Sequence, residues 1–179
     1  MNDFERTDSE VKWKGSIISA GVERFRYADG TEVSREKVWH PGAVGILAVD
    51  DEHVWLTRQP REAIGGAASL EVPAGKLDME GEPPLETAKR ELGEEIGKRA
   101  GEWQEIACFF TSPGFSDERV WLYLAQELED DPDAEPIEDE RIEIVPWPLT
   151  RLDEAIAACE DSKSLIALLW LAYRRAAAG

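Results

Sequence analysis

The sequence has 179 residues, of which 42% are hydrophobic, and a formal net charge of −18 from 38 acidic and 20 basic side chains. The length suits one domain with a hydrophobic core, and the apolar fraction excludes an intrinsically disordered chain. An acidic surface repels nucleic-acid phosphates and anionic lipid, so neither nucleic acid nor a membrane is expected as a partner. A phosphate-bearing substrate would need a metal ion or local arginines to reverse this field.

The cellular setting is predicted from three features. The polar start MNDFERTDSEVKWKG has no apolar segment and predicts no secretory signal. The longest apolar run, Leu165 to Tyr173, is too short to span a bilayer and predicts a buried helix. Cys108 and Cys159 offer neither a disulfide framework nor a metal spacing, which favours a reducing, cytoplasmic setting.

The first half of the chain is predicted to be rich in strands. Residues 11–40 have the pattern of short strands broken by the turn signal ADG at 28–30. Residues 43–50 and 53–59 flank the acidic turn DDE and predict a buried hairpin. A short strand follows in LEVPAGKLD, residues 70–78.

A helix is predicted over PPLETAKRELGEEIG, residues 83–97. Its prolines stand at the start, where a missing N–H does no harm, and Gly97 is the natural residue to follow the last turn. Strands are then predicted at 103–112, 119–128 and 141–147, and helices at 152–158 and about 164–177.

This order of elements predicts an α/β (α+β) fold with a mixed sheet between helical layers. We expect the N-terminal strands, residues 1–40, to form a separate small antiparallel sheet with a role in dimerisation. Residues 41–179 would form the main domain.

The predicted helix carries four aliphatic side chains on one stripe, which should face the core: Leu85, Ala88, Leu92 and Ile96. Glu91 and Glu95 are four residues apart and lie beside each other, and Glu94 can pair with Arg90. A divalent cation would turn the repulsion between Glu91 and Glu95 into ligation, and oxygen ligands suit Mg²⁺ or Mn²⁺. Taken alone, these carboxylates favour an ordinary solvated helix face.

The whole segment GKLDMEGEPPLETAKRELGEEIGK, starting at Gly75, resembles the Nudix box. That pattern is G, five residues, E, seven residues, then R-E-U-x-E-E-x-G-U, where U is a bulky aliphatic. The matching positions are Gly75, Glu82, Arg90, Glu91, Leu92, Glu94, Glu95 and Gly97. Two positions depart from it: six residues instead of five precede Glu82, and Lys98 stands at the final U, where it should affect packing and not chemistry.

The resemblance implies a Nudix-type α/β/α sandwich that hydrolyses a nucleoside diphosphate linked to another group, with two or three Mg²⁺ or Mn²⁺ ions. By motif position, Glu91 and Glu95 would be the principal metal ligands, together with the main-chain carbonyl of Ala74. Glu94 would be an accessory ligand and Arg90 would orient the glutamates. The ions would neutralise the pyrophosphate, activate water and stabilise the leaving phosphate.

The regions around the box resemble bacterial ADP-ribose pyrophosphatases. In FFTSPGFSDERVWLYLA, residues 109–125, Pro113 stands about where that subfamily has a proline past the box, so Pro113 and Gly114 are assigned to a substrate loop; a simple turn is the alternative. Arg61 and Arg35 stand where related enzymes use basic side chains around the substrate. The planar fork of arginine suits phosphate oxygens, although surface arginine is the alternative for each.

The acidic loop EPIEDERIEI, residues 135–144, resembles the subfamily loop that carries the catalytic base. Matching EDERI onto that loop makes Glu138 the base and Glu140 an added metal ligand. The base has to take a proton from water that the metal ions have already activated. Any of Glu138, Asp139 or Glu140 could serve.

Together these features predict a Mg²⁺-dependent Nudix hydrolase that cleaves ADP-ribose to AMP and ribose 5-phosphate and forms a homodimer. A hydrolase of another nucleoside diphosphate sugar, such as GDP-mannose, is the nearest alternative, and a non-catalytic Nudix-fold binding module is a second. Four aromatic residues are candidates to stack on the nucleobase, with core packing as the alternative for each: Trp13, Phe25, Tyr27 and Phe115.

Overall fold

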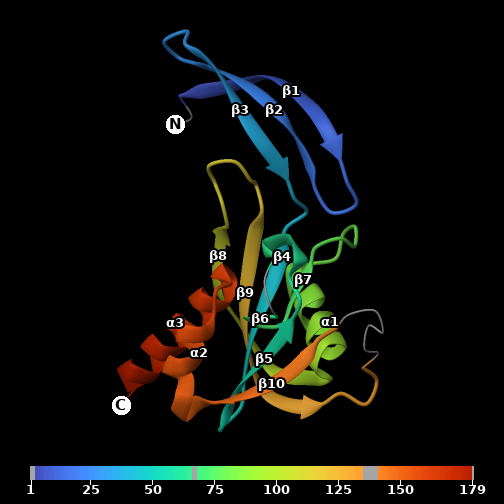
Figure 1. Cartoon of the computed structure of the whole chain (residues 1–179), viewed down its shortest axis with the longest axis vertical. Coiled ribbons are helices and arrows are strands. Elements are labelled where there is room, and N and C mark those ends of the chain that lie inside the picture. Colours follow the sequence, from blue (N-terminus) through green and yellow to red (C-terminus); the bar gives the residue numbers. More distant parts are fainter. Residues whose placement is uncertain (1–2, 66–67, 135–140, 179) are drawn as a thin grey trace. The chain divides into compact units, whose positions relative to one another are not determined.

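The computed structural model describes residues 3–65, 68–134 and 141–178. The chain divides into two compact units (Figure 1). Unit 1 contains residues 1–42 and 109–119, and unit 2 contains residues 43–108 and 120–179. The sequence alone places 109–119 in the domain 41–179, whereas in the structure this segment groups with the N-terminal strands.

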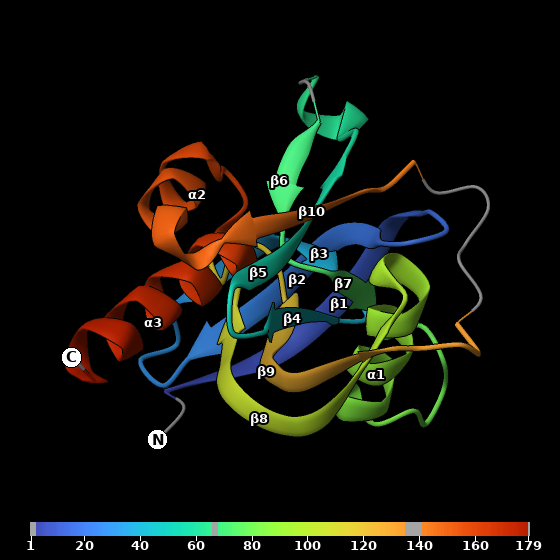
Figure 2. The ribbon, with the colours of Figure 1, turned by 90° about the horizontal axis from the view of Figure 1, so that it is seen from below.

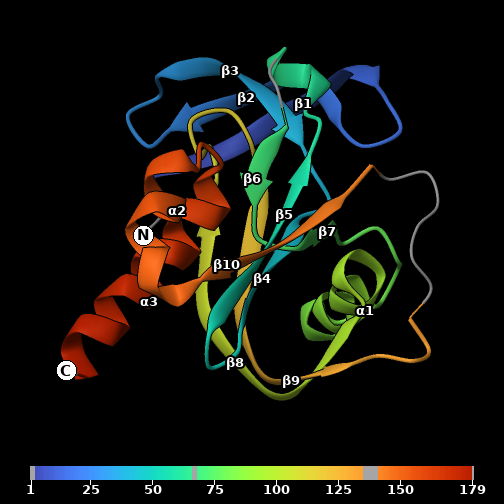
Figure 3. The same ribbon diagram turned by 60° about the horizontal axis from the view of Figure 1, so that its bottom comes forward.

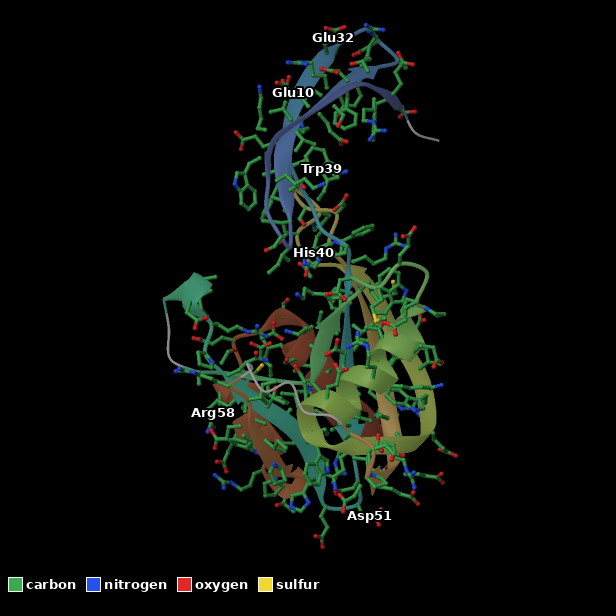
Figure 4. All side chains as sticks on the ribbon, turned by 90° about the vertical axis from the view of Figure 1, so that its right-hand side faces the viewer. Glu10, Glu32, Trp39, His40, Asp51 and Arg58 are labelled. Carbon is green, nitrogen blue, oxygen red and sulfur yellow. The ribbon has the colours of Figure 1, made fainter. Side chains whose placement is uncertain are left out.

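Unit 1 is built on an antiparallel sheet in the order β1 (Phe4–Lys14), β2 (Ser19–Tyr27) and β3 (Glu32–Trp39). Figure 4 labels residues at both ends of β3, Glu32 and Trp39. The predicted ADG turn joins β2 to β3, with Gly30 at a φ of 86°. The first strand begins at Phe4, well before residue 11. Because β1 is exposed along its whole length, it has no apolar alternation by which the sequence could reveal it.

Unit 2 contains a mixed sheet in the order β10 (Glu143–Pro148), β5 (His53–Gln59), β4 (Ala43–Val49), β9 (Arg119–Asp130) and β8 (Lys98–Phe110). The central pair, β4 and β9, is parallel, whereas β5 is antiparallel to both β4 and β10. Figure 2 shows β10 beside β5. Two short strands, β6 (Ser69–Glu71) and β7 (Ala74–Lys76), pair with β5 and β4 respectively.

The β4–β5 hairpin forms as the sequence predicts, and one acidic side chain fixes its turn. Asp50 Oδ1 accepts hydrogen bonds from the backbone N–H groups of Glu52 and His53, at 2.8 and 2.6 Å. Its Oδ2 accepts the indole N–H of Trp55 at 2.7 Å. Burial by itself would raise the pKa of Asp50, but these donors outweigh it and lower the pKa.

Helices cover both faces of this sheet. Figure 3 shows α1 (Pro84–Ile96) on one side and α2 (Leu152–Ala158) with α3 (Ser162–Ala178) on the other. Short 3₁₀ turns, Glu62–Ile64 and Leu149–Arg151, complete the elements of the described residues. The predicted α/β/α sandwich with a mixed sheet is therefore confirmed, as is the small antiparallel sheet.

The core beneath α1 combines the stripe predicted on that helix with alternate residues of two strands. Its buried members are Val44, Ile46, Ala48, Ala88, Leu92, Ile96, Tyr123 and Ala125. Burying a side chain of this kind contributes about 1.5–3 kcal/mol, so this layer holds α1 firmly against the sheet.

The apolar run in α3 buries one face only. Leu168 and Leu171 are buried, while Leu169 and Tyr173 are exposed. In the part of the chain that the structure describes, no helix combines the length and apolar character needed to cross a membrane.

Candidate metal and phosphate site

Helix α1 presents the carboxylates of the box, and its two ends are set by the residues that the sequence singles out. Pro83 caps the helix with extended backbone, and Pro84 occupies the first turn. Gly97 ends it in the left-handed conformation, with φ of 65°, and its N–H returns to the carbonyl of Gly93 at 2.8 Å.

Glu91 and Glu95 are buried, with exposed fractions of 7% and 6%. A solvated helix face would leave such side chains in water, so that interpretation is wrong for this pair. Burial of two neighbouring carboxylates is costly unless other groups compensate their charge. The residues around them therefore have to supply that compensation.

The strand residues 74 and 75 form a cradle for the two carboxylates. The backbone N–H of Ala74 donates to Glu95 Oε2 at 2.9 Å. A Cβ placed on Gly75 would lie 2.1 Å from Glu91 Oε1, so only glycine leaves room for that carboxylate. The box glycine and the box glutamates thus meet in space, from β7 and α1.

Arg90 is the cation at the centre of the box carboxylates. Its Nη1 lies 2.9 Å from Glu91 Oε1 and 2.7 Å from Glu94 Oε2, and its Nη2 lies 3.5 Å from Glu82 Oε2. Burial lowers the pKa of Arg90, but the charges of Glu91 and Glu94 and the hydrogen bond to Glu82 outweigh it and raise the pKa overall. The pairing of Arg90 with Glu94, predicted from their spacing, is confirmed.

Glu82 joins this network despite the extra loop residue before it. The hydroxyl of Thr87, which is fully buried, donates to Glu82 Oε2 at 2.7 Å, the same oxygen that faces Arg90. The extra residue therefore lies in the loop before the helix and does not move Glu82 away from Arg90. Glu82 contacts Arg90 from the N-terminal side of the helix.

The donor set fits a hard divalent cation. Mg²⁺ prefers carboxylate and carbonyl oxygens, and Glu91, Glu95 and the Ala74 main chain lie together, with the carboxylates braced by Gly75 and Arg90. Within the described residues, no three acidic, histidine or cysteine side chains already converge as a cation would require. Arg90 and the Ala74 N–H hold the carboxylates instead, so binding a cation would exchange these contacts for metal ligation.

A second charged cluster lies near the cradle, around a glutamate that no sequence motif marks. Glu71 is buried and accepts two hydrogen bonds from Arg61 and one from Lys163, each at 2.7 Å. Burial would raise the pKa of Glu71, but its two cationic partners outweigh it and lower the pKa to about 2. The only sequence signal is an acidic residue inside the apolar run of LEVPAG.

Arg61, a predicted phosphate-binding residue, is therefore already paired and is 40% exposed at its side chain. The hydrogen bond that it donates to Glu71 raises its pKa most, while burial opposes this and the charges of Glu71, Asp161 and Glu95 raise it further.

The other predicted substrate residues, Arg35, Pro113 and Gly114, line one cavity of about 410 Å³ inside unit 1. Three of the four candidate stacking residues, Phe25, Tyr27 and Phe115, also line it, whereas Trp13 does not. Phe4 packs edge-on against both Phe25 and Tyr27. The cavity therefore has aromatic walls and a mixed charged lining, with two cations, Arg35 and Lys37, and three carboxylates, Glu23, Glu36 and Asp117.

A family model of the Nudix domain matches residues 39–169. The chain belongs to the Nudix family. The resemblance predicted from the box is thereby confirmed.

Curated relatives agree with this assignment. The chain is 44% identical over 128 residues to a Mycobacterium tuberculosis protein named ADP-ribose pyrophosphatase, a match that covers 71% of this chain and 61% of the relative. It is 38% identical over 174 residues to a Bacillus subtilis protein of the same name, covering 93% and 91%. A Bacillus methanolicus protein named methanol dehydrogenase activator is 35% identical over 175 residues, covering 94% and 92%.

A solved structure titled as an ADP compounds hydrolase shares the fold. It superposes with a TM-score of 0.85 at 21% identity and covers 100% of this chain and 97% of its own. The predicted Nudix fold is confirmed by this match. The candidate base Glu138, its neighbour Asp139 and the candidate ligand Glu140 lie outside the described residues, so their roles stay predictions.

Proposed function

We propose that this Nudix protein hydrolyses the pyrophosphate of ADP-ribose to AMP and ribose 5-phosphate with Mg²⁺ as cofactor. The observation that carries the proposal is the buried pair Glu91 and Glu95 against Ala74 and Gly75. The choice of ADP-ribose as substrate is supported by two relatives that are named ADP-ribose pyrophosphatase. A non-catalytic module would have no need to keep two buried carboxylates beside a backbone cradle.

Each residue of the site has a distinct task. Glu91, Glu95 and the Ala74 carbonyl would hold the cation, with Glu94 as an accessory ligand. When bound, Mg²⁺ neutralises the pyrophosphate charge and activates water. Arg90 orients the carboxylates, because its Nη1 touches both Glu91 and Glu94. Arg61 binds the pyrophosphate, for which a guanidinium fork is suited. A chain with net charge −18 needs such cations to admit an anionic substrate.

Glu138 is proposed as the general base that removes a proton from the attacking water, and Glu140 as an added metal ligand. An ordinary carboxylate is sufficient once the water is activated. Glu138→Gln should lower kcat more than Asp139→Asn does. The reverse order would assign the base to Asp139.

The cavity in unit 1, taken by itself, is proposed to bind a nucleoside. Its volume of about 410 Å³ falls in the usual range of ligand pockets, and aromatic rings suit a flat base. Arg35 supplies a cation at its wall, and Pro113 and Gly114 shape the loop. Phe115→Ala should weaken the binding of adenosine more than Trp13→Ala does, because Phe115 lines the cavity and Trp13 does not.

A homodimer assembled through the N-terminal strands is also proposed. Val11, Trp13 and Ile17 are each more than half exposed in unit 1, which is unusual for apolar side chains unless a partner covers them. Light scattering should give twice the mass of one chain, and Trp13→Glu should shift it toward the monomer. We place the protein in the cytoplasm, since Cys108 and Cys159 are both free thiols.

A substrate panel tests the function. With Mg²⁺, the protein should release AMP from ADP-ribose faster than it turns over GDP-mannose, NADH or nucleoside triphosphates. Preference for GDP-mannose would make it a hydrolase of another nucleoside diphosphate sugar. Failure to hydrolyse any member would favour a binding or regulatory module, a role suggested by the activator name of one relative.

A further inference from the structure

We propose that Glu71 is the positioning residue of Arg61, and that Lys163 fixes Glu71 from its other side. The inference rests on the proposed function, in which Arg61 binds the pyrophosphate. Neither Glu71 nor Lys163 touches the substrate. Their task is to deliver the guanidinium in one orientation relative to the metal-binding carboxylates.

The contact between Glu71 and Arg61 is a two-point fork. Arg61 Nε donates to Glu71 Oε1 and Arg61 Nη2 donates to Glu71 Oε2, both at 2.7 Å. Two parallel charge-assisted hydrogen bonds fix the plane of a guanidinium as well as its place. The Glu71 side chain is only 3% exposed, whereas the Arg61 side chain is 40% exposed. The fork does not use Nη1, which is the group that Arg61 can offer to a phosphate.

Lys163 gives Glu71 a second cation. Its Nζ donates to Glu71 Oε2 at 2.7 Å and lies 3.0 Å from Asp161 Oδ1, with the Lys163 side chain 15% exposed. A buried carboxylate with one partner would lose its compensation whenever that partner moved toward substrate. With Lys163 in place, Glu71 stays ionised while Arg61 engages an anion.

The segment that carries Glu71 is braced at two further points. The N–H of Val72 donates to Ser164 Oγ at 2.8 Å, and the Pro73 carbonyl accepts the N–H of Ile46 at 2.8 Å. Asp161 in turn caps the start of α3 by accepting the Ser164 N–H at 3.0 Å. This short braced segment runs directly from Glu71 to Ala74.

One rigid segment therefore sets both the arginine and the metal cradle. Ala74 binds Glu95 through its N–H, and Glu71 three residues earlier holds Arg61. The charge of Glu95 contributes to the raised pKa of Arg61, after the hydrogen bond and charge of Glu71 and the charge of Asp161. The Glu71 side chain is 3% exposed and that of Arg61 40%, so the guanidinium keeps an accessible side while its carboxylate partner is buried.

The test compares Glu71→Gln with Arg61→Ala in steady-state kinetics on ADP-ribose. Glu71→Gln should raise KM about 10- to 100-fold, the range for losing a charge-assisted hydrogen bond, with kcat within about threefold of wild type. Arg61→Ala should do the same, and the double variant should be no worse than Arg61→Ala alone. Glu86→Gln is the matched control, since Glu86 is exposed on α1 and pairs with Lys89.

Stability is controlled separately from positioning. If Glu71→Gln does not fold, the charge-balanced variant Glu71→Gln/Lys163→Gln removes one anion and one cation and should show the same rise in KM. Lys163→Gln alone should raise KM less, because Glu71 still holds Arg61. A general structural loss would instead lower kcat in parallel with the melting temperature.

Several outcomes overturn the inference. A wild-type KM in Glu71→Gln, while Arg61→Ala is impaired, removes the positioning role and leaves the proposed function intact. A wild-type KM in Arg61→Ala would also remove the positioning role of Glu71, because Arg61 would then not bind the substrate. If the wild type hydrolyses no ADP-ribose, the proposed function fails, and calorimetric binding of inorganic pyrophosphate decides: both variants should weaken it, and unchanged binding overturns the positioning role.

Discussion

Gly75 lies so close to Glu91 that a Cβ on it would stand 2.0 Å from the carboxylate carbon of that side chain. Its φ is not in the left-handed region, so the need for glycine is steric and not conformational. The requirement for glycine at the first position of the box therefore comes from Glu91 near its end. A residue with a side chain would fill the space that the buried Glu91 carboxylate occupies against the backbone of β7.

Gly75→Ala should therefore displace the Glu91 carboxylate and disrupt the metal cradle. We expect kcat/KM on ADP-ribose to fall at least about 100-fold, the size of losing roughly 3 kcal/mol of transition-state stabilisation. The measurement is kcat/KM as a function of Mg²⁺ concentration. The variant should need a higher Mg²⁺ concentration for half-maximal activity. Wild-type activity in this variant would show that Glu91 does not need its present position.

Gly93→Ala is the matched control within the same motif. Close packing against a neighbouring strand would explain a glycine in mid-helix, but a Cβ there would meet Asp131 Oδ2 at 3.4 Å, an ordinary contact. Because glycine costs a helix interior about 0.5–1 kcal/mol relative to alanine, Gly93→Ala should raise the free energy of unfolding by about that amount. Urea denaturation measures it, and activity should stay at the wild-type level.

The two glycines show where the sequence is informative. Helix α1, its aliphatic stripe and its caps were predictable, because they depend on spacings within about fourteen residues. The burial of Glu91 and Glu95 was not, since an acidic helix face has the same pattern in water as in a cradle. That distinction depends on β7, which the helix meets only in the folded chain.

Distance along the chain explains what was missed. The hydrogen bond from Lys163 to Glu71 joins residues 92 positions apart, and the acidic residue within LEVPAG gives no sign of which cation it meets. Residues 4–10 of strand β1 were missed for a different reason, because an exposed strand has no apolar period. Arg61 was identified only through the family resemblance. Its partner Glu71 could not be identified in that way.

Glu95→Gln should abolish turnover and leave the fold intact. Glutamine has the same shape and its carbonyl oxygen can still accept the Ala74 N–H, so the backbone contact survives. The lost charge weakens cation binding. Mg²⁺ should raise the melting temperature of the wild type, by mass action on the folded state, and raise that of the variant less. A fully active variant would remove Glu95 from the metal site.

The acid stability of the protein should depend on Glu71. Its pKa is about 2 in the folded state against an ordinary value of 4.5 for a glutamate, so the folded state binds fewer protons than the unfolded chain in this window. Its stabilising contribution, on the order of 3 kcal/mol, is therefore complete above pH 4.5 and is lost as the pH falls toward 2. The free energy of unfolding from urea titrations at several pH values measures the loss.

Glu71→Gln gives the comparison for this pH dependence. The wild type should exceed the variant in stability most at about pH 6 to 7, and the gap should narrow as the pH drops below 4.5. Glu86→Gln, which removes an exposed carboxylate, should track the wild type at each pH. A gap that stays constant down to about pH 3 would mean that Glu71 is not held ionised by Arg61 and Lys163.

Lys98 occupies the last position of the box, where the pattern has an aliphatic residue, and it packs against the ring of Trp55. Its Nζ lies 4.4 Å from the centroid of Trp55 and 2.6 Å from Asp130 Oδ1, and its stem is largely buried. Lys98→Met keeps the stem packing but loses the cation–π contact and an exposed ion pair, so stability should fall by only about 1 kcal/mol. Activity should not change, because the side-chain partners of Lys98 are Trp55 and Asp130, which lie outside the cradle. Lys98→Ala should cost more, since it also removes the stem, and a stabilised Lys98→Met would mean that Trp55 gains nothing from the ammonium.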